Sequence, residues 1–442
     1  MRDRQEPRLE TGRSGLGYRE AMLHIEDACL GDIAARVATP FYCYSSAAIR
    51  SAYERLSQAL APVGASICFA VKANGNLSIL SLLAESGCGM DIVSGGELER
   101  VLAAGIPGSR VVFSGVGKKS GEIGRALKAG IHQINVESAA ELETVIATAR
   151  ELGLKAPVAL RVNPDVDAHT HAKISTGRKD DKFGISSAEI ADLYAKAALA
   201  PELDVVGLAV HIGSQILDLA PYREAYSHMA ALVMALRARG LAVRRLDLGG
   251  GIGIDYAGES GPDVAEYAAI VGETVGGIGC ELTVEPGRWL VGPAGVLVTE
   301  VLYVKQTGDT PTAIVDAAMN DLMRPALYGA FHRVLPVRQG VAEATGPYRI
   351  VGPVCESTDV FGTYADVPLP RSGDLVAFTC AGAYGASMAS TYNARDLVPE
   401  VLVDGDLFRV IRRRQATAEL LALEEPTQWQ KHHADAVAMG GP

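Results

Sequence analysis

Short apolar runs rich in β-formers alternate with amphipathic segments between about residues 66 and 287. In the amphipathic segment 222–240, apolar residues recur three and four positions apart and arginines gather near its end, which is typical of a helix packed on a core. Strands that alternate with helices pair in parallel through right-handed crossovers. Eight such repeats predict a closed (β/α)8 TIM-like barrel, with a doubly wound open sheet as the alternative. The eight runs are 66–71, 89–93, 110–115, 132–136, 158–163, 205–213, 244–251 and 281–287.

The pattern changes after residue 290. Strand-like runs separated by Pro/Gly turns follow one another with few helical patterns between them, which predicts a mainly antiparallel β-domain at 291–420. The barrel is expected to occupy 46–290. The first 45 residues are too short to fold alone and are expected to pack on the β-domain, and 421–442 form a tail. The strand-like runs are 295–306, 312–318, 348–354, 374–380 and 400–414.

Composition narrows the classes of partner. The net charge of −11 argues against a nucleic-acid or anionic-membrane partner, so an anionic ligand must be held by local arginines or backbone amides. The seven cysteines form no CxxC pair, which suits a reducing cytosol. No uncharged apolar stretch is long enough to span a bilayer, and the polar start is not a secretory signal. These features predict a cytoplasmic protein.

Chemically versatile residues stand where the barrel runs end, and in a (β/α)8 barrel the active site lies at the C-terminal ends of the strands. We therefore expect them to share one rim. They are Lys72 after the first run, Arg161 and Asn163 after the fifth, His211 and Ser214 after the sixth, Gly249, Gly250 and Gly251 after the seventh, and Glu285 with Arg288 after the eighth.

Each of these residues also has a plainer interpretation. Lys72 is either a strand-end lysine that reaches water or a reactive amine that forms a Schiff base. His211 is either a core histidine or a catalytic one. Residues 249–251 form either a tight turn or a phosphate-binding loop; they also fit an S-adenosylmethionine loop, although such a loop normally follows a first strand. His169 and His171 lack nearby acidic or cysteine ligands, so no metal site is expected.

Glu285 and Arg288 flank a Pro-Gly turn and form either a surface ion pair or part of a cofactor site. A carboxylate opposite a pyridine nitrogen would keep that nitrogen protonated, so that the ring accepts electrons released at a substrate α-carbon. The polar segment 165–184 is either a substrate-covering loop or a solvated insertion. The β-domain adds further candidates: Arg324, Tyr328, Cys355, Glu356 and Tyr384.

Taken together, seven motifs make the chain resemble the fold-type III pyridoxal-phosphate decarboxylases, and among them the diaminopimelate decarboxylases, from about residue 40 to about residue 410. This resemblance implies an alanine-racemase-like fold, pyridoxal 5'-phosphate as cofactor, and a homodimer whose subunits share active sites. The motifs are "FAVKAN", "HIGSQI", "LDLGGGIGIDY", "VEPGR", "MRPALYGAFH", "GPVCESTDVF" and "GAYGASMASTYN".

The resemblance also implies roles around the cofactor. Lys72 would form the Schiff base, and burial together with the cofactor's cations would favour its neutral amine. His211 would stack on the ring and Glu285 would pair with the pyridine nitrogen. The residues implied to hold the phosphate are Ser214, Gly249, Gly250, Gly251, Gly287 and Arg288.

On the substrate side, the resemblance implies that Cys355 donates the proton after carbon dioxide leaves, and that Cys355 and Glu356 come from the partner subunit. Glu356 would bind the far ammonium of the substrate, and Tyr384 would touch both substrate and cofactor. The far carboxylate would be bound by Arg288, Arg324 and Tyr328.

The implied reaction is the decarboxylation of meso-2,6-diaminopimelate to L-lysine and carbon dioxide, the last step of lysine biosynthesis. Two arginines beside one acidic residue match a zwitterionic substrate end better than a lone ammonium, because bidentate Arg–carboxylate pairing supplies energy and orientation.

The alternatives to this activity are related decarboxylases of D-ornithine, D-lysine, carboxynorspermidine or a carrier-tethered amino acid. A racemase is disfavoured because the racemases of this fold place an arginine at the pyridine nitrogen. A non-enzymatic cofactor carrier or silent regulator would not need Cys355, Arg324 or Glu356.

Overall fold

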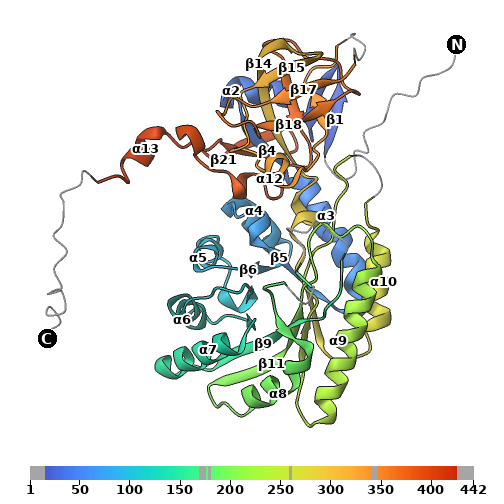
Figure 1. The fold of residues 1–442 in the computed structure, drawn as a ribbon, viewed down its shortest axis with the longest axis vertical. Coiled ribbons are helices and arrows are strands. Elements are labelled where there is room, and N and C mark those ends of the chain that lie inside the picture. Colours follow the sequence, from blue (N-terminus) through green and yellow to red (C-terminus); the bar gives the residue numbers. More distant parts are fainter. Residues whose placement is uncertain (1–14, 169–175, 178–180, 258–260, 341–345, 426–442) are drawn as a thin grey trace.

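The computed structural model describes residues 15–168, 176–177, 181–257, 261–340 and 346–425. His169 and His171 lie outside the described residues. The chain forms two lobes, a barrel surrounded by helices and a β-sheet domain above it (Figure 1).

The lower lobe is a closed barrel of parallel strands. The sheet closes because β13 pairs with β5 and β8 pairs with β9, so the open-sheet alternative is wrong and the predicted TIM-like barrel is confirmed. A two-residue strand, β10 (Ile185–Ser186), adds to β9. In sequence order the barrel strands of the described residues are β5 (Ser66–Ala70), β6 (Gly89–Ile92), β7 (Val111–Phe113), β8 (Gln133–Val136), β9 (Ala156–Asn163), β11 (Leu203–Val210), β12 (Arg245–Asp247) and β13 (Glu281–Val284).

Helices cover the outside of the barrel (Figure 1). Local sequence explains where several begin: the Ser94 hydroxyl accepts from the Glu97 amide and that of Ser138 from the Glu141 amide, which satisfies amides at two helix N-termini. The helices are α3 (Ser46–Leu60), α4 (Leu77–Glu85), α5 (Gly95–Ala103), α6 (Ser120–Lys128), α7 (Ala139–Leu152), α8 (Ser187–Ala198), α9 (Ala220–Ala238) and α10 (Val264–Thr274).

The upper lobe is the mainly antiparallel β-domain that the sequence predicts. Its longest strand, β14 (Gly295–Thr307), pairs antiparallel with three others, whereas β15 with β17 and β4 with β20 are parallel pairs. The remaining strands are β15 (Thr310–Val315), β16 (Val334–Pro336), β17 (Tyr348–Val351), β18 (Val360–Tyr364), β19 (Leu375–Phe378), β20 (Glu400–Asp404) and β21 (Leu407–Arg412).

Residues from before the barrel contribute to this upper lobe. Strand β4 (Phe41–Ser45) lies between β14 and β20, and a small sheet packs nearby around buried Leu23 and Ile25. From residue 15 the described chain thus begins in the upper lobe, crosses to the barrel at α3 and returns after β13. The proposed limits at residues 45, 290 and 420 stay a prediction. The small sheet and its helix are β1 (Leu16–Arg19), β2 (Met22–Ile25), β3 (Ala28–Cys29) and α2 (Leu30–Val37).

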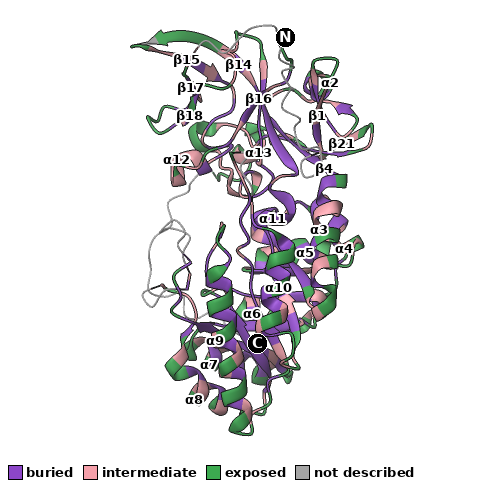
Figure 2. Cartoon of the chain, turned by 90° about the vertical axis from the view of Figure 1, so that its right-hand side faces the viewer, coloured by how far each residue is buried: buried purple, intermediate pink, exposed green. Residues whose placement is uncertain are grey.

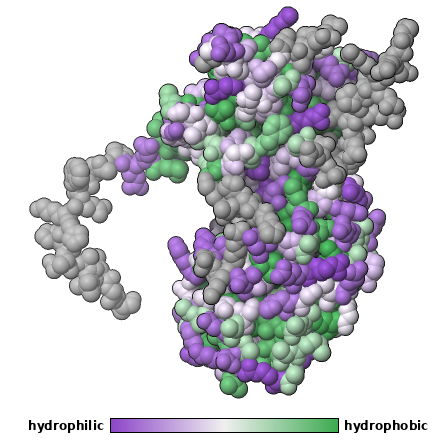
Figure 3. Space-filling model, turned by 45° about the vertical axis from the view of Figure 1, so that its right-hand side comes forward, coloured by the Kyte–Doolittle hydropathy of each residue, from purple (hydrophilic) through white to green (hydrophobic). Residues whose placement is uncertain are grey.

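Burial follows this architecture. The barrel strands and the inward faces of the helices are buried, and exposed residues lie on the outer helix faces (Figure 2). On the face drawn in Figure 3, hydrophilic side chains cover much of the lower lobe. Among the residues that the structure describes, none of the helices combines the length and apolar character needed to cross a bilayer.

Candidate active site

A cavity of about 630 Å³ opens at the C-terminal ends of the barrel strands, and the β-domain supplies part of its wall. Because these ends meet on one rim, side chains far apart in sequence face one space. The cavity brings together Lys72, His211, Ser214, Glu285, Arg288, Arg324, Tyr328 and Tyr384.

Lys72 follows β5 in a short 3-10 turn, η2 (Val71–Ala73), and its Nζ lies 2.9 Å from Asp91 Oδ2. Asp91, on β6, is fully buried. Burial lowers the pKa of Lys72, but the Asp91 carboxylate, Tyr384 and Glu285 outweigh it and raise the pKa above its usual value. Burial thus favours the neutral amine, as expected, but these three groups outweigh burial, so the ammonium is favoured. The expected effect of the cofactor's cations stays a prediction.

The segment after Lys72 is tied to the β-domain. Asn74 Nδ2 donates to the Gly382 carbonyl (3.1 Å), and Asn76 Nδ2 donates to Glu400 Oε1 (2.9 Å). The Tyr384 amide donates to the Ala73 carbonyl (2.8 Å). Both asparagines are buried, so their amides need these partners. The asparagines of "FAVKANGN" thus fix the lysine turn against the second lobe.

His211 follows β11, and its Nδ1 accepts a hydrogen bond from the Gly250 amide (3.0 Å). An acceptor at Nδ1 places the proton of a neutral ring on Nε2. Burial, Arg161 and Lys72 all lower the pKa of His211 well below its usual value. The ring at this wall of the cavity is therefore neutral.

Part of the glycine loop after β12 bonds to and packs on other groups of the protein. The Gly249 amide donates to Asp247 Oδ1 (3.0 Å), and a Cβ on Gly250 would stand 2.0 Å from the Glu285 carbonyl oxygen. Glycine is thus required for close packing here. The amides of Gly249 and Gly250 donate to protein acceptors. Of the three glycines, Gly251 is therefore the one whose amide we expect to bind a ligand.

Glu285 follows β13 and is buried. Its pKa is raised well above the usual value by burial and by the neighbouring Asp247 and Asp91 carboxyls, although Lys72 opposes them. Burial likewise raises the pKa of Asp247, which also accepts from Asn135 Nδ2 (2.8 Å). Two carboxyls this close favour a state in which they share one proton. Within the described residues, Glu285 Oε1 has no hydrogen-bond partner.

At another side of the cavity two guanidinium groups lie near one tyrosine. Arg288 donates to Tyr256 Oη (2.6 Å) and Ser214 Oγ (3.0 Å), and lies 4.6 Å from the Tyr384 ring centre. Arg324 lies 4.2 Å from the Tyr256 ring centre. Neither arginine is ion-paired to a carboxylate of the described residues. The region therefore carries net positive charge that suits anions.

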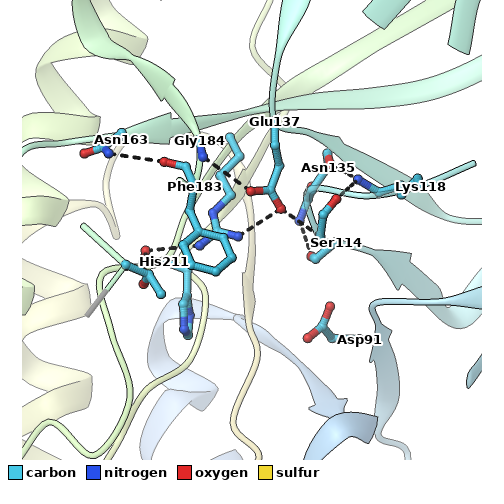
Figure 4. Close-up of polar contacts among 12 residues, drawn as sticks. Asp91, Ser114, Lys118, Asn135, Glu137, Asn163, Phe183, Gly184 and His211 are labelled. Carbon is cyan, nitrogen blue, oxygen red and sulfur yellow. Dashed lines mark hydrogen bonds and ion pairs between the residues drawn. The ribbon is translucent and has the colours of Figure 1, made fainter. Parts of the chain in front are cut away.

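The rim beside these groups is braced by a second polar network (Figure 4). Glu137 accepts from the Gly115 amide (2.7 Å), Arg161 Nη1 (3.0 Å) and the Gly184 amide (3.3 Å), which joins three loops. Phe183 lies 5.1 Å from the Arg161 guanidinium and lines the cavity. The described end of the polar segment 165–184 therefore contributes to the wall.

Comparison with known proteins places this geometry in a family. Residues 46–292 match the family described as "Pyridoxal-dependent decarboxylase, pyridoxal binding domain". The chain is 50% identical over 407 residues to a diaminopimelate decarboxylase of Pseudomonas aeruginosa, covering 92% of this chain and 98% of that protein. The chain belongs to the pyridoxal-dependent decarboxylases, in the diaminopimelate decarboxylase family.

Solved structures of the family agree with the fold. A diaminopimelate decarboxylase from Helicobacter pylori complexed with L-lysine is 43% identical, with a TM-score of 0.86 over 89% of this chain and 98% of that one. A diaminopimelate decarboxylase from M. jannaschii, also in complex with L-lysine, is 35% identical, with a TM-score of 0.86 over 94% of this chain and 98% of that one.

The cavity fits the cofactor of this decarboxylase family. Lys72 offers an amine, and Glu285 offers a buried carboxyl oxygen that has no partner among the described residues. Ser214 and Arg288 offer a hydroxyl and a guanidinium, of which the Nε likewise has no partner in the described part of the chain. An aldehyde, a ring nitrogen and a phosphate need such groups.

Some predicted site residues do not line the cavity: the three glycines of the loop after β12, together with Asn163, Gly287, Cys355 and Glu356. Cys355 and Glu356 are exposed on a loop of the β-domain between β17 and β18. Gly287 lies behind the wall, where an added Cβ would approach Ala73 Cβ (3.0 Å) and Ala70 Cβ (3.1 Å). Gly287 thus supports the lysine turn by close packing.

Several residues of this decarboxylase site were missed from the sequence. Asp91 pairs with Lys72, Asp247 neighbours Glu285, and Tyr256 contacts both arginines. The signal for the two aspartates is an acidic residue inside an otherwise apolar strand, "GMDIV" and "RLDL", because a buried carboxyl needs a compensating partner. Tyr256 carries no such signal.

Tyrosines on α9 hold the glycine loop of the decarboxylase site from outside. Tyr222 Oη donates to the Gly250 carbonyl (3.1 Å) and Tyr226 Oη to the Leu248 carbonyl (3.2 Å).

We expect Tyr222→Phe to weaken pyridoxal phosphate binding by about fivefold, the value of one buried hydrogen bond, in a titration of the cofactor-free protein. Tyr194→Phe is the matched control, since Tyr194 Oη donates to the Ala242 carbonyl (2.7 Å) away from the loop. Equal weakening in both variants would contradict a role for the loop.

Proposed function

We propose that this chain decarboxylates meso-2,6-diaminopimelate to L-lysine and carbon dioxide with pyridoxal 5'-phosphate. One observation supports this most directly. A single cavity holds the Lys72 amine, the Glu285 carboxyl and two guanidinium groups that no carboxylate of the described residues neutralises. The site therefore offers an attachment point, an acidic group and an excess of positive charge for anions.

The first task of these residues is to hold the cofactor. Lys72 would hold the cofactor until the substrate amine takes its place, and the bound pyridoxal phosphate would supply an acceptor for the electrons released at the substrate α-carbon. Lys72 gives up its ammonium proton on attachment, and Asp91, 2.9 Å away, is the nearest acceptor for it. The neutral His211 ring would pack on the cofactor without adding charge, and the Glu285 carboxyl would keep a proton at its ring nitrogen. Ser214, Arg288 and the Gly251 amide would hold its phosphate.

The second task is to orient the substrate. Arg324 and Tyr328, together with Arg288, bind the far carboxylate, and Tyr384 contacts substrate and cofactor at the same time. Diaminopimelate carries a carboxylate and an ammonium at its far end, whereas a simple diamine precursor carries an ammonium alone. Burying two guanidiniums with no carboxylate opposite them would be costly, so a substrate with a far carboxylate is favoured.

The third task, protonation of the α-carbon, falls to Cys355 of a second copy of the chain, with Glu356 of that copy at the far ammonium. The exposure of both residues outside the cavity of their own chain supports this arrangement. We therefore propose a homodimer with shared sites, acting in the cytoplasm.

Mixing two inactive variants tests the shared site. Lys72→Ala and Cys355→Ala disable different halves of one site, so a mixed dimer regains one intact site of its two. Random exchange of subunits is expected to restore about a quarter of wild-type activity, because half of the dimers are mixed. Mixtures that stay inactive after verified subunit exchange, or Cys355→Ala protein that turns over at the wild-type rate, would contradict the shared site.

Substrate assays test the function itself. Carbon dioxide release is expected from meso-diaminopimelate and far less from D-ornithine, D-lysine, carboxynorspermidine or a carrier-tethered amino acid. Amino-acid racemization is expected to be absent, because Glu285 and not an arginine would pair with the ring nitrogen. Protein that acquires the visible absorption of bound cofactor yet releases no carbon dioxide from any of these compounds would support a carrier or silent regulator instead.

A further inference from the structure

Arg324 is held by neutral groups. Its Nη1 donates to His332 Nε2 (2.7 Å), and its guanidinium lies 4.2 Å from the Tyr256 ring centre. The residue is buried, and its Nε has no hydrogen-bond partner among the described residues. A buried guanidinium with an unused donor needs a further acceptor.

The His332 ring is fixed and its tautomer is determined by its partners. Nδ1 lies 2.8 Å from the Thr379 carbonyl, which can only accept, so Nδ1 carries the proton. Nε2 faces Arg324, which can only donate, so Nε2 carries the lone pair. The Tyr364 hydroxyl also donates to the His332 carbonyl (3.0 Å), and the Tyr256 ring lies edge-on at 5.1 Å.

A protonated His332 would direct an N–H at a guanidinium. Burial and the adjacent Arg324 lower the pKa of His332 to about 3, in agreement with the hydrogen-bond pattern. His332 is fully buried, between α12 (Arg324–Tyr328) and β16. The ring therefore orients Arg324 while leaving its positive charge uncompensated.

The neutrality of this partner has a consequence for binding. An aspartate or glutamate at the same place would orient Arg324 equally well but would pair its charge, leaving little attraction for an incoming carboxylate. Arg288 nearby is held in the same manner, by the hydroxyls of Tyr256 and Ser214. The cavity thus keeps both charges available for ligands.

We propose that His332 is a positioning residue for substrate specificity, which holds Arg324 through a neutral ring so that the guanidinium selects ligands with a far carboxylate. This inference rests on the proposed function, because it assigns the far carboxylate of the substrate to Arg324. Sequence reasoning missed His332, although it stands within "MRPALYGAFH", eight residues after the arginine it contacts.

Two ligands that differ by one carboxylate test the proposal. L-lysine keeps the far carboxylate of diaminopimelate, and pentane-1,5-diamine lacks it. Their dissociation constants are measured with the cofactor-loaded protein from the change in visible absorption of the cofactor on titration. Wild-type protein is expected to bind L-lysine at least about tenfold more tightly than the diamine, the value of one charge-assisted hydrogen bond.

Two substitutions separate positioning from a structural role. His332→Asn retains a donor near the Thr379 carbonyl but is too short to accept from Arg324. His332→Gln reaches the position of Nε2 and offers Arg324 an acceptor. We expect the preference for L-lysine to fall to about one in the Asn variant and to stay within about threefold of wild type in the Gln variant. Diamine binding is expected to change little in either.

The outcomes distinguish failure of the proposed function from failure of the role of His332 alone. A wild-type protein without preference for L-lysine and without diaminopimelate turnover overturns the proposed function, and this inference with it. A wild-type preference that survives in His332→Asn, or is lost equally in both variants, overturns the role of His332 alone.

A second measurement needs no variant. Nitrogen NMR of 15N-histidine-labelled wild-type protein is expected to show that the His332 ring is neutral and protonated at Nδ1 at pH 6. A cationic His332 ring at that pH contradicts the proposal.

Discussion

Lys72→Ala protein is expected to lose covalent attachment of pyridoxal phosphate and, with it, at least about 10³-fold in diaminopimelate turnover, because no other amine can replace an activated nucleophile at that place. Lys72 is the only lysine among the described residues that line the cavity. Borohydride reduction followed by peptide mapping measures the attachment. Cofactor is expected on the wild-type peptide that contains Lys72 and on no peptide of the variant.

Lys72→Arg serves as the matched variant. The guanidinium keeps a positive charge beside Asp91 but stays protonated, so it cannot attack an aldehyde. Both variants are therefore expected to be inactive. Lys72→Arg is expected to unfold at a higher temperature than Lys72→Ala, because the buried Asp91 keeps a cationic partner. Activity in the arginine variant, or labelling of another lysine in wild-type protein, would refute Lys72 as the attachment point.

The barrel could be predicted because its physical signature is local. Parallel strands are buried on both faces, so they appear as continuous apolar runs such as "SICFAV" and "VALRVN". Each of the eight runs overlaps a barrel strand, for example 66–71 with β5 (Ser66–Ala70) and 205–213 with β11 (Leu203–Val210). Closure follows from the number of repeats, although the pairing of β13 with β5 is visible only in the structure.

The convergence of Lys72, His211 and Glu285 could be predicted for a related reason. A closed parallel barrel brings the C-terminal ends of all strands to one rim, so position along the run is enough to place them. The β-domain residues Arg324 and Tyr384 follow no such rule. Their place in the site came from resemblance to the decarboxylase family, since nothing local indicates how a second domain sits on the rim.

Partnerships between strands and loops could not be predicted. Whether Asp91 meets Lys72 depends on the register of β5 and β6 and on the turn of η2, which sequence periods do not encode. The raised pKa of Lys72 follows largely from that pairing, so burial, which lowers this pKa, does not by itself decide the direction of the shift. In the same way, the amides of Gly249 and Gly250 already have protein acceptors, so three adjacent glycines did not mean three amides free for a phosphate.

Glu285→Gln protein is expected to bind the cofactor with nearly wild-type affinity but to turn over about 10²- to 10³-fold more slowly, the usual effect of removing one preorganised electrostatic group. The amide matches the shape of the carboxyl, so the close packing of the Gly250 loop on the Glu285 backbone is retained. What the amide cannot do is stabilise a proton on the ring nitrogen, because it carries no negative charge.

Asp247→Asn is the matched control for that substitution. Asp247 lies in the same buried carboxyl cluster but does not line the cavity. Burial raises the pKa of both carboxyls, and repulsion by Asp247 raises that of Glu285 further. Removing the Asp247 charge leaves Glu285 without that repulsion, so its carboxylate becomes easier to form and turnover is expected to stay within about tenfold of wild type. The measurement is kcat for diaminopimelate with saturating cofactor. Equal losses in the two variants would show that the cluster supports the fold and that Glu285 has no separate electrostatic role.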